Sequence, residues 1–325
     1  MSESFSIVIP TFNSLPYVEE CVASALGQTH GNVEVVVDDN ASHDGTPETL
    51  ESRFGSDGRL RVYKNTEDLN IPNGWNRAIS HATGEYLLLL HSDNILHPDF
   101  VRLVLEKVQS TQGKVLYTEC KYFEGETPAA LFGSAPEAIT HDHLGRGPGA
   151  VAYAFRFQRM IPTSALAIHR SCFERRLPYD VRYRWDPDIE QMAWLAHEFG
   201  VVHLRFPLAA IRTHKGQAAS WKDPTFSTQY RELLLLEHQR GLTERHHFLL
   251  DWASSNQYIA ERISEIGGPS TAMVKYLNRW LASELRVLAH FQAQFLRRLK
   301  QAVITLLHWA RIRTGRSVGR AAART

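Results

Sequence analysis

The sequence predicts an α/β fold, in which a mostly parallel sheet carries helices on both faces and a helical extension follows at the C-terminus. Short apolar runs rich in β-branched residues alternate with runs of helical spacing from residue 5 to about residue 120. Such alternation favours parallel strands covered by helices. From residue 226 onward the spacing is helical, with one break at Gly267-Gly268-Pro269. At 325 residues, 43% of them hydrophobic and 22% charged, the chain can bury a full-sized core.

The first predicted strand, Phe5–Pro10, is followed by a helix-like run at Leu15–Leu26, and the alternation then continues along the chain. The further predicted strands are Val33–Val37, Leu60–Tyr63, Glu85–Leu90, Val115–Thr118, Ser164–His169 and Val201–Arg205. The further predicted helices are Thr46–Phe54, Pro72–His81, Pro98–Gln109 and Asp188–Phe199. Pro72 suits the first turn of its helix, and Asn70 is a candidate cap for it.

The stretch 121–150 interrupts the pattern with Gly, Pro and His. Irregular segments of this length inside a compact domain are disordered or functional, so we expect an acceptor-binding or lid loop here. The run His141-Asp142-His143 looks like a metal cluster, but no further ligand set stands near it, which favours a solvated loop over a zinc site. We expect an α/β domain at residues 1–222 and a helical region at residues 223–325.

The formal net charge of +1 conceals a basic tail. After Glu284 the chain has nine basic residues and no acidic one, which leaves 27 basic against 35 acidic residues, a formal charge of −8, before it. Within residues 281–325, the run Leu281–Arg313 combines these charges with apolar residues at helical spacing, as in helices that lie on anionic membranes. Packing against the α/β domain, or against a second copy in a homo-oligomer, explains the same pattern equally well.

The compartment is indicated by the cysteines and by the apolar runs. Cys21, Cys120 and Cys172 are widely spaced, as in proteins of reducing compartments. The N-terminus lacks a signal-peptide pattern, and no apolar run is long enough to cross a bilayer. We therefore expect a cytoplasmic protein that touches a membrane only at its surface, on the inner face. Nucleic acid is not an expected partner, because the basic tail lacks an aromatic platform or a groove-reading motif.

Two acidic positions stand at the ends of predicted strands. Asp38-Asp39 ends the run Val33–Val37, and Asp93 follows the run Glu85–Leu90. A carboxylate at the carboxyl edge of a buried strand is costly to desolvate, and in an open α/β sheet that edge is where ligands bind. The two positions therefore indicate a site for a cation, or for a ligand that brings a cation with it.

Several stretches, in order along the chain, carry a resemblance to a known family. They are Ser6–Asn13; Val35–Ser42 with Asp44-Gly45-Thr46; Asn76 with Ala82-x-Gly84-Glu85-Tyr86; Ser92-Asp93-Asn94 with Pro98; Asp188-Ile189-Glu190; and Arg212-Thr213-His214. Together they resemble family 2 glycosyltransferases over residues 5–220. The resemblance implies a GT-A fold, which is Rossmann-like, and transfer of a sugar from a nucleotide-activated donor with inversion at the anomeric carbon.

The resemblance assigns the nucleotide to the ends of the first two strands. Asp39 matches the family's base-binding aspartate, which accepts the imide N–H of uracil or thymine. The same carboxylate suits guanine but repels cytosine, whose ring nitrogen there is an acceptor, so a UDP-linked donor is expected. Asp38, Thr11 and Asn13 are candidates to frame the nucleotide. All four residues have an alternative role in ordering a turn or capping a helix.

Asp93 matches the metal-binding position of the family's Asp-x-Asp motif. The cation is expected to be Mg²⁺ or Mn²⁺, because phosphate oxygens, a carboxylate and water make an oxygen-rich site. Ser92 stands where a first aspartate is usual, which weakens the motif. His214 is a candidate metal ligand or pyrophosphate donor, Arg212 a phosphate partner, and Asn76 a nucleotide-binding residue. A loop-capping aspartate and a structural histidine are the alternatives.

Asp188 resembles the family's catalytic base, with Asp186 as its rival. A carboxylate can remove the proton of an acceptor hydroxyl if it lies within hydrogen-bond reach and its pKa is at or below the working pH. Pro187 replaces the acidic residue that usually precedes the base. Both aspartates precede a helix and could simply cap it. Glu190 is a candidate for holding the acceptor or for facing solvent.

The function that the resemblance implies is metal-dependent, inverting transfer of a sugar from a UDP-sugar to a saccharide or lipid-linked acceptor, as in polysaccharide biosynthesis. One alternative is a non-catalytic subunit that binds nucleotide sugars or glycans. Another is a sugar nucleotidyltransferase. This class needs a Gly-rich, Arg-containing loop after the first strand, and the chain has Pro10-Thr11-Phe12-Asn13 there.

Overall fold

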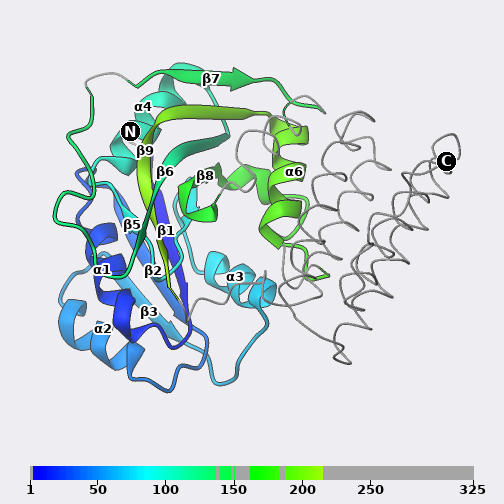
Figure 1. Cartoon of the computed structure of the whole chain (residues 1–325). Helices are drawn as coiled ribbons and strands as arrows, with labels where there is room; N and C mark the ends of the chain where they lie inside the picture. The colour runs from blue at the N-terminus through cyan, green and yellow to red at the C-terminus, as the bar shows by residue number, and fades with distance from the viewer. Residues whose placement is uncertain (1–2, 137–138, 148–149, 151–161, 183–186, 215–325) are drawn as a thin grey trace, which may run out of the picture. The chain divides into compact units, whose positions relative to one another are not determined.

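The structure is a computed structural model that describes residues 3–136, 139–147, 150, 162–182 and 187–214 (Figure 1). All of these residues belong to one compact unit of the chain. The predicted boundary at residue 222, the helical region at residues 223–325 with its basic tail, and Asp186 lie outside the described residues. Within the described part, no helix is long and apolar enough to cross a membrane.

The described strands form one nine-stranded sheet. They are β1 (Phe5–Thr11), β2 (Val33–Asp39), β3 (Leu60–Lys64), β4 (Tyr86–Leu89), β5 (Ile95–Leu96), β6 (Val115–Glu124), β7 (His141–Leu144), β8 (Leu166–His169) and β9 (Val201–Thr213). Along the sheet the order is β3-β2-β1-β4-β8-β6-β9-β5, and β7 pairs with β9 beside this path.

Most of the described strands run in one direction. β1 is parallel to β2 and β4, β2 to β3, and β6 to β9. β8 is antiparallel to both β4 and β6, so β6 runs the same way as β4. β5 and β7 are antiparallel to β9. The prediction of a mostly parallel sheet is therefore confirmed, with β8 as a reversed strand inside it.

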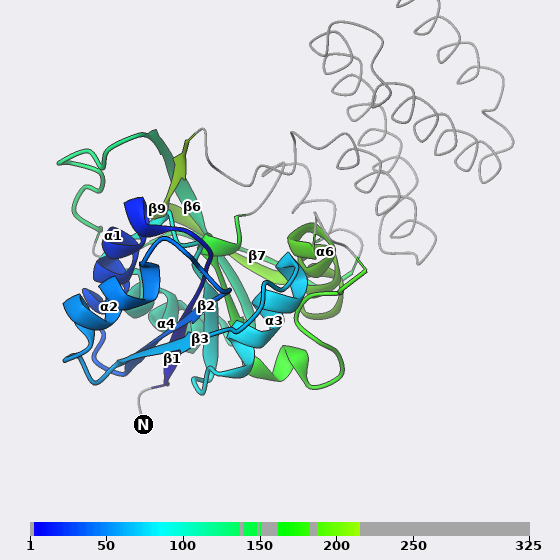
Figure 2. The ribbon, with the colours of Figure 1, turned by 90° about the horizontal axis from the view of Figure 1, so that it is seen from below.

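Helices cover both faces of the sheet, as predicted. They are α1 (Leu15–Leu26), α2 (Thr46–Phe54), α3 (Ile71–Ser80), α4 (Phe100–Thr111) and α6 (Pro187–Phe199), with short 3-10 turns η1 (Thr163–Ala165) and η2 (Arg170–Phe173). Figure 2 shows α1, α2 and α4 on one side of the strands and α3 and α6 on the other.

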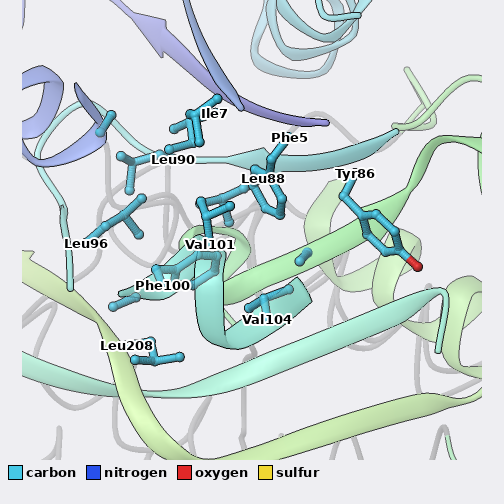
Figure 3. Packing of buried hydrophobic residues seen from close by; sticks show 14 of the residues in the cluster. Phe5, Ile7, Tyr86, Leu88, Leu90, Leu96, Phe100, Val101, Val104 and Leu208 are labelled. Atoms are coloured by element: carbon cyan, nitrogen blue, oxygen red, sulfur yellow. The ribbon is translucent and has the colours of Figure 1, made fainter. Parts of the chain in front are cut away.

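The central strands are apolar on both faces because helices cover both faces. Phe5 and Ile7 of β1 point into the largest cluster of buried side chains, where Phe100 and Val104 of α4 pack against them (Figure 3). Val8, the residue after Ile7, faces the opposite side and packs with α3. Full burial of such side chains contributes about 1.5–3 kcal/mol each. This two-sided packing fixes the edge of the sheet at which β1, β2 and β4 end.

Local sequence features determine how the chain enters β4. The Asn70 side chain caps α3 by accepting a hydrogen bond from the Asn73 backbone N–H at 3.1 Å, and a proline follows in the first turn, as predicted. A Cβ atom at Gly84 would lie 2.6 Å from Ser6 Oγ and 2.7 Å from Ser6 N. Glycine is therefore required where the chain enters β4, because its backbone approaches β1 so closely. The position of β4 in turn determines where Asp93 lies.

The part of the sheet formed by β6, β7 and β9 differs from the prediction. β6 and β9 extend to Glu124 and Thr213, well past the predicted strands. Their ladder passes a register shift opposite Pro207, which has no N–H to donate and is tolerated at such an irregularity. The prediction of an irregular stretch at 121–150 is wrong at its start, which lengthens β6, and at His141–Leu144, which forms β7 against β9.

Candidate active site

The predicted donor-binding residues lie at the carboxyl ends of β1 and β2. Thr11 and Asp39 are direct partners at the last position of this parallel pair. β4 lies on the other side of β1, and the chain leaves it at Leu89 toward Asp93. The fold therefore brings Thr11, Asp39 and Asp93 to one edge of the sheet, where ligands bind in open α/β folds.

The loops after β1 and β2 are joined to each other by hydrogen bonds. The Asn13 N–H donates to Ser42 Oγ (2.8 Å), and the His43 N–H donates to Asn13 Oδ1 (2.9 Å). Asn13 and Ala41 have positive φ angles of 48° and 63°. This left-handed conformation costs a residue with a side chain about 1–2 kcal/mol, and such strain concentrates at ligand sites. A nucleotide contact from Asn13 stays a prediction.

Asp39 is 2% exposed, and both of its carboxylate oxygens accept hydrogen bonds from Ser42. Oδ2 accepts from the backbone N–H at 2.9 Å and Oδ1 from the hydroxyl at 2.5 Å. These bonds orient the carboxylate and leave lone pairs for a further donor. The neighbouring Thr11 Oγ1 is buried and has no hydrogen-bond partner among the described residues. A buried hydroxyl of this kind is available to a ligand.

Asp38 points to the opposite face from Asp39, because side chains alternate along a strand. Asn65 Nδ2 donates to its carboxylate at 3.0 Å, and His81 Nε2 and Arg77 Nε lie 3.2 Å and 3.6 Å away. Burial raises the pKa of Asp38, although Arg77 and His81 act to lower it. These contacts tie β2 to β3 and α3, as in the turn-ordering alternative. Contact of Asp38 with a nucleotide stays a prediction.

Asp93 and His214 come together although they are 121 residues apart. His214 Nε2 lies 3.2 Å from Asp93 Oδ2, both side chains are largely buried, and the Tyr17 ring packs on the histidine at 4.5 Å. A carboxylate oxygen and an imidazole nitrogen that converge in this way fit a divalent cation. Among the described residues no three His, Cys, Asp or Glu side chains form a metal-binding group, and this includes the segment with His141.

The departure from the metal motif lies at His91. In an Asp-x-Asp motif that ends at Asp93, the first aspartate stands two residues earlier, so its place is taken by His91 and the prediction that named Ser92 is wrong. Ser92 Oγ instead lies 2.7 Å from Ser14 Oγ. His91 Nε2 is 2.8 Å from Thr163 Oγ1, so this histidine is directed at η1.

Asp188 lies half-buried in the first turn of α6. Burial raises the pKa of its carboxyl group, while the charge of His91 and the backbone N–H groups of Asp188 and Ile189 lower it in part. The electrostatic interaction with His91 places Asp188 beside the chain segment that leads from β4 to Asp93. The structure therefore brings a carboxylate whose pKa is raised by burial near His91, two residues before Asp93. Its role as a base stays a prediction.

Two polar contacts hold the chain that leads to Asp188. Asn76 of α3 donates from Nδ2 to the Tyr179 carbonyl (2.7 Å) and accepts at Oδ1 from the Tyr179 N–H (2.8 Å). Glu190 is 1% exposed and pairs with Arg176 through both oxygens, at 2.8 and 2.6 Å. Glu190 therefore neither faces solvent nor stands ready for an acceptor. Nucleotide binding by Asn76 stays a prediction, and no local sequence pattern indicated its contact with Tyr179.

The family model for glycosyl transferase family 2 matches residues 6–166, from β1 to the start of β8. The chain belongs to glycosyl transferase family 2. The matched residues include Asp39 and Asp93, whereas Asp188 and His214 lie beyond them.

Relatives with curated names that match part of this chain include a glycosyltransferase and a chondroitin synthase. The chain is 32% identical over 116 residues to the glycosyltransferase GlyG of Streptococcus pneumoniae, which covers 36% of this chain and 38% of GlyG. It is 37% identical over 102 residues to the chondroitin synthase of Pasteurella multocida, which covers 31% of this chain and 10% of that enzyme. The chain therefore spans well under half the length of either relative.

Solved structures share the fold. Residues 1–349 of S. aureus TarS, in complex with UDP-GlcNAc, superpose with a TM-score of 0.64 at 16% identity, over 85% of this chain and 79% of the TarS 1–349 chain. The mannosyltransferase PcManGT from Pyrobaculum calidifontis, in complex with GDP-Man and Mn²⁺, gives a TM-score of 0.57 at 14% identity, over 94% of this chain and 86% of that enzyme. The predicted GT-A fold is thereby confirmed.

Proposed function

We propose that this family 2 glycosyltransferase moves a sugar from a UDP-sugar to a hydroxyl of a saccharide or lipid-linked saccharide, with inversion and with a divalent cation. The observation that carries the proposal is the placement of Asp188. Its carboxylate, with a raised pKa, interacts with His91, two residues before Asp93. A proton acceptor near the predicted cation site is what direct displacement of a nucleoside diphosphate requires.

Asp39 is the residue that would select the nucleobase. Ser42 holds its carboxylate in one orientation, so the remaining lone pairs can accept the imide N–H of uracil. Guanine offers an equivalent N–H, and the two structural neighbours were solved with UDP-GlcNAc and with GDP-Man. The higher TM-score of TarS supports UDP. Thr11, whose hydroxyl has no hydrogen-bond partner in the part of the chain that the structure describes, is the second candidate contact to the nucleotide.

Asp93 and His214 would hold the cation. When bound, the cation neutralises the negative charge that builds up on the departing diphosphate. Two side chains leave most coordination positions to phosphate oxygens and water, so we expect cation and donor to bind together. An imidazole nitrogen suits Mn²⁺ better than Mg²⁺, which prefers oxygen ligands. The Mn²⁺ in PcManGT supports the same choice.

Asp188 would act as the general base. It takes the proton of the acceptor hydroxyl while that oxygen forms a bond to the anomeric carbon. On the opposite face of the sugar, the bond from this carbon to the diphosphate oxygen breaks, and UDP leaves with the bonding electron pair. A raised pKa makes the carboxylate a better proton acceptor, provided that it is ionised at the working pH.

The test is a screen of UDP-, dTDP- and GDP-sugars for donor hydrolysis and transfer, together with calorimetry of UDP binding with and without Mn²⁺. We expect turnover of one UDP-sugar and tighter UDP binding when Mn²⁺ is present. Asp93→Asn should lose the effect of Mn²⁺. Glu106→Gln, which removes an exposed carboxylate on α4, serves as the matched control and should behave as wild type. UDP binding that is indifferent to metal, without hydrolysis of any donor, would show a binding subunit instead.

A further inference from the structure

We propose that Arg212 is a positioning residue that holds Asp93 and His214 in place for the cation and ties the segment after β6 to that site, instead of contacting the donor phosphates. The inference deepens the proposed function and rests on it for the identity of the ligands. Its structural basis is a set of contacts that converge on one buried guanidinium group.

Arg212 holds the metal motif through two separate atoms. Its backbone N–H donates to Asn94 Oδ1 at 2.9 Å, and its side-chain Nε donates to the Asp93 carbonyl at 3.0 Å. Asn94 in turn donates from Nδ2 to Ser164 Oγ at 2.9 Å. One residue of β9 therefore fixes the backbone of Asp93. His214, the other predicted metal ligand, follows Arg212 by only two residues.

The rest of the guanidinium is enclosed between two aromatic rings. Its Cζ atom lies 4.8 Å from the Tyr17 ring centroid and 4.6 Å from that of Phe123, and Arg212 as a whole is 1% exposed. Tyr17 also packs on the His214 ring at 4.5 Å. The same aromatic side chain thus contacts both the guanidinium and the predicted metal ligand, so movement of one is transmitted to the other.

The two terminal nitrogens reach helix α1 and the segment after β6. Nη2 donates to Glu20 Oε2 at 2.5 Å and to Thr127 Oγ1 at 3.0 Å, and Nη1 donates to the Gly125 carbonyl. Thr127 Oγ1 also donates to Glu20 Oε2, at 2.6 Å. Arg212, Glu20 and Thr127 therefore form a closed triangle that joins α1, β9 and the segment 125–127.

This enclosure argues against a phosphate contact. A phosphate could reach the guanidinium only if the aromatic rings moved apart and the bonds to Glu20 and Gly125 broke, and a buried cation that loses its partners is strongly destabilising. The charge of Arg212 is already compensated by Glu20. The arrangement is that of an outer-shell residue, which orients a metal ligand without touching the metal.

The test compares Arg212→Gln and Arg212→Lys with the milder Glu20→Gln and Thr127→Val. Calorimetry measures UDP affinity without metal and Mn²⁺ affinity in the UDP complex. Hydrogen exchange of residues 123–127 and 93–94 needs no ligand. For Arg212→Gln we expect Mn²⁺ affinity to fall about 10-fold or more, metal-free UDP affinity to change less than about 2-fold, and exchange to accelerate in both segments. Glu20→Gln should shift Mn²⁺ affinity and exchange in the same direction by less.

A fall in metal-free UDP affinity as large as the fall in Mn²⁺ affinity would identify Arg212 as a phosphate ligand and overturn the inference. Unchanged exchange at 93–94 in every variant would overturn it as well. If Arg212→Gln does not fold, Glu20→Gln and Thr127→Val decide by the same two measurements. Because exchange requires no sugar transfer, a wild-type protein that fails to turn over any donor would refute the proposed function and leave this test intact.

Discussion

In the predicted donor loops, residues 11–15 and 38–46, the carboxylate of Asp39 is held by a neighbour close in sequence, whereas the side chains of the proposed catalytic cluster, Asp93, Asp188, Arg212 and His214, depend on distant partners. Asp39 is fixed by Ser42, three residues on. Arg212, by contrast, bonds to Glu20 across 192 residues. A local arrangement survives loosening of the remainder of the fold, but a long-range one does not. Variants should therefore separate nucleotide binding from catalysis.

The largest effect is expected from Asp93→Asn in the catalytic cluster. Loss of the cation removes several kcal/mol of transition-state stabilisation, so Mn²⁺-dependent transfer should fall by about 10²- to 10⁴-fold. Metal-free UDP binding through Asp39 should persist. Initial rates and calorimetry measure the two. Equal loss of transfer and of metal-free UDP binding would mean that the two regions are not separable.

Next in size is the stability difference between two glycine variants. Gly200 and Gly45 both have positive φ, 74° and 87°. A Cβ at Gly200 would lie 2.4 Å from the Leu144 carbonyl, whereas nothing lies within 4 Å of one at Gly45. Gly200→Ala should lower the free energy of unfolding by about 3–5 kcal/mol, and Gly45→Ala by about 1–2 kcal/mol. Urea titrations decide this, and equal losses would contradict the contact with β7.

Asn76→Ala and Ser42→Ala compare a distant contact with a local one. Asn76→Ala loses both hydrogen bonds to Tyr179, at a cost of about 2 kcal/mol, and loosens the chain that leads to Asp188. We expect kcat to fall while UDP affinity is kept. Ser42→Ala removes the hydroxyl bond to Asp39 Oδ1 and keeps the backbone bond to Oδ2, so UDP affinity should fall with kcat at saturation largely retained. The opposite assignment of kcat and affinity would show that Asn76 binds the nucleotide.

The smallest effect is expected from Ala41→Gly. Its φ of 63° is unfavourable for alanine, and glycine relieves the strain but gains freedom in the unfolded chain. The net result should be a stabilisation of about 0.5 kcal/mol, measured as a small rise in Tm. A fall in Tm would show that the Ala41 methyl group makes a stabilising contact that outweighs the strain.

The part of the fold from β1 to β4 could be predicted almost completely, because a local sequence pattern indicates each of its elements. β1 to β4 and the helices between them lie within a few residues of the predicted ranges, and Asn70 caps α3 as expected. Predictions failed where the structure depends on which strands pair with each other. The direction of β8, the length of β6 and β9, and the strand β7 depend on neighbours that no local pattern identifies.

The candidate site divides in the same way. The location of Asp39 and Asp93 at one edge of the sheet could be predicted, because each follows a predicted strand. The burial of Arg212, the use of the Asn76 amide by Tyr179 and the interaction of His91 with Asp188 are products of tertiary packing. A histidine two residues before Asp93 was the one signal in the sequence that could have been noticed, since it stands in place of the motif's first carboxylate.

The central claim is that Asp188 is the base, and the most direct measurement is the transfer rate of Asp188→Asn as a function of pH, with UDP affinity determined in parallel. In the wild type, transfer should fall as pH decreases through the Asp188 pKa, which burial raises, because the protonated carboxyl cannot accept a proton. Asp188→Asn should lose about 10²- to 10⁴-fold in rate, lose this acid limb and bind UDP as wild type does. A variant that keeps both the wild-type rate and the acid limb would contradict the account.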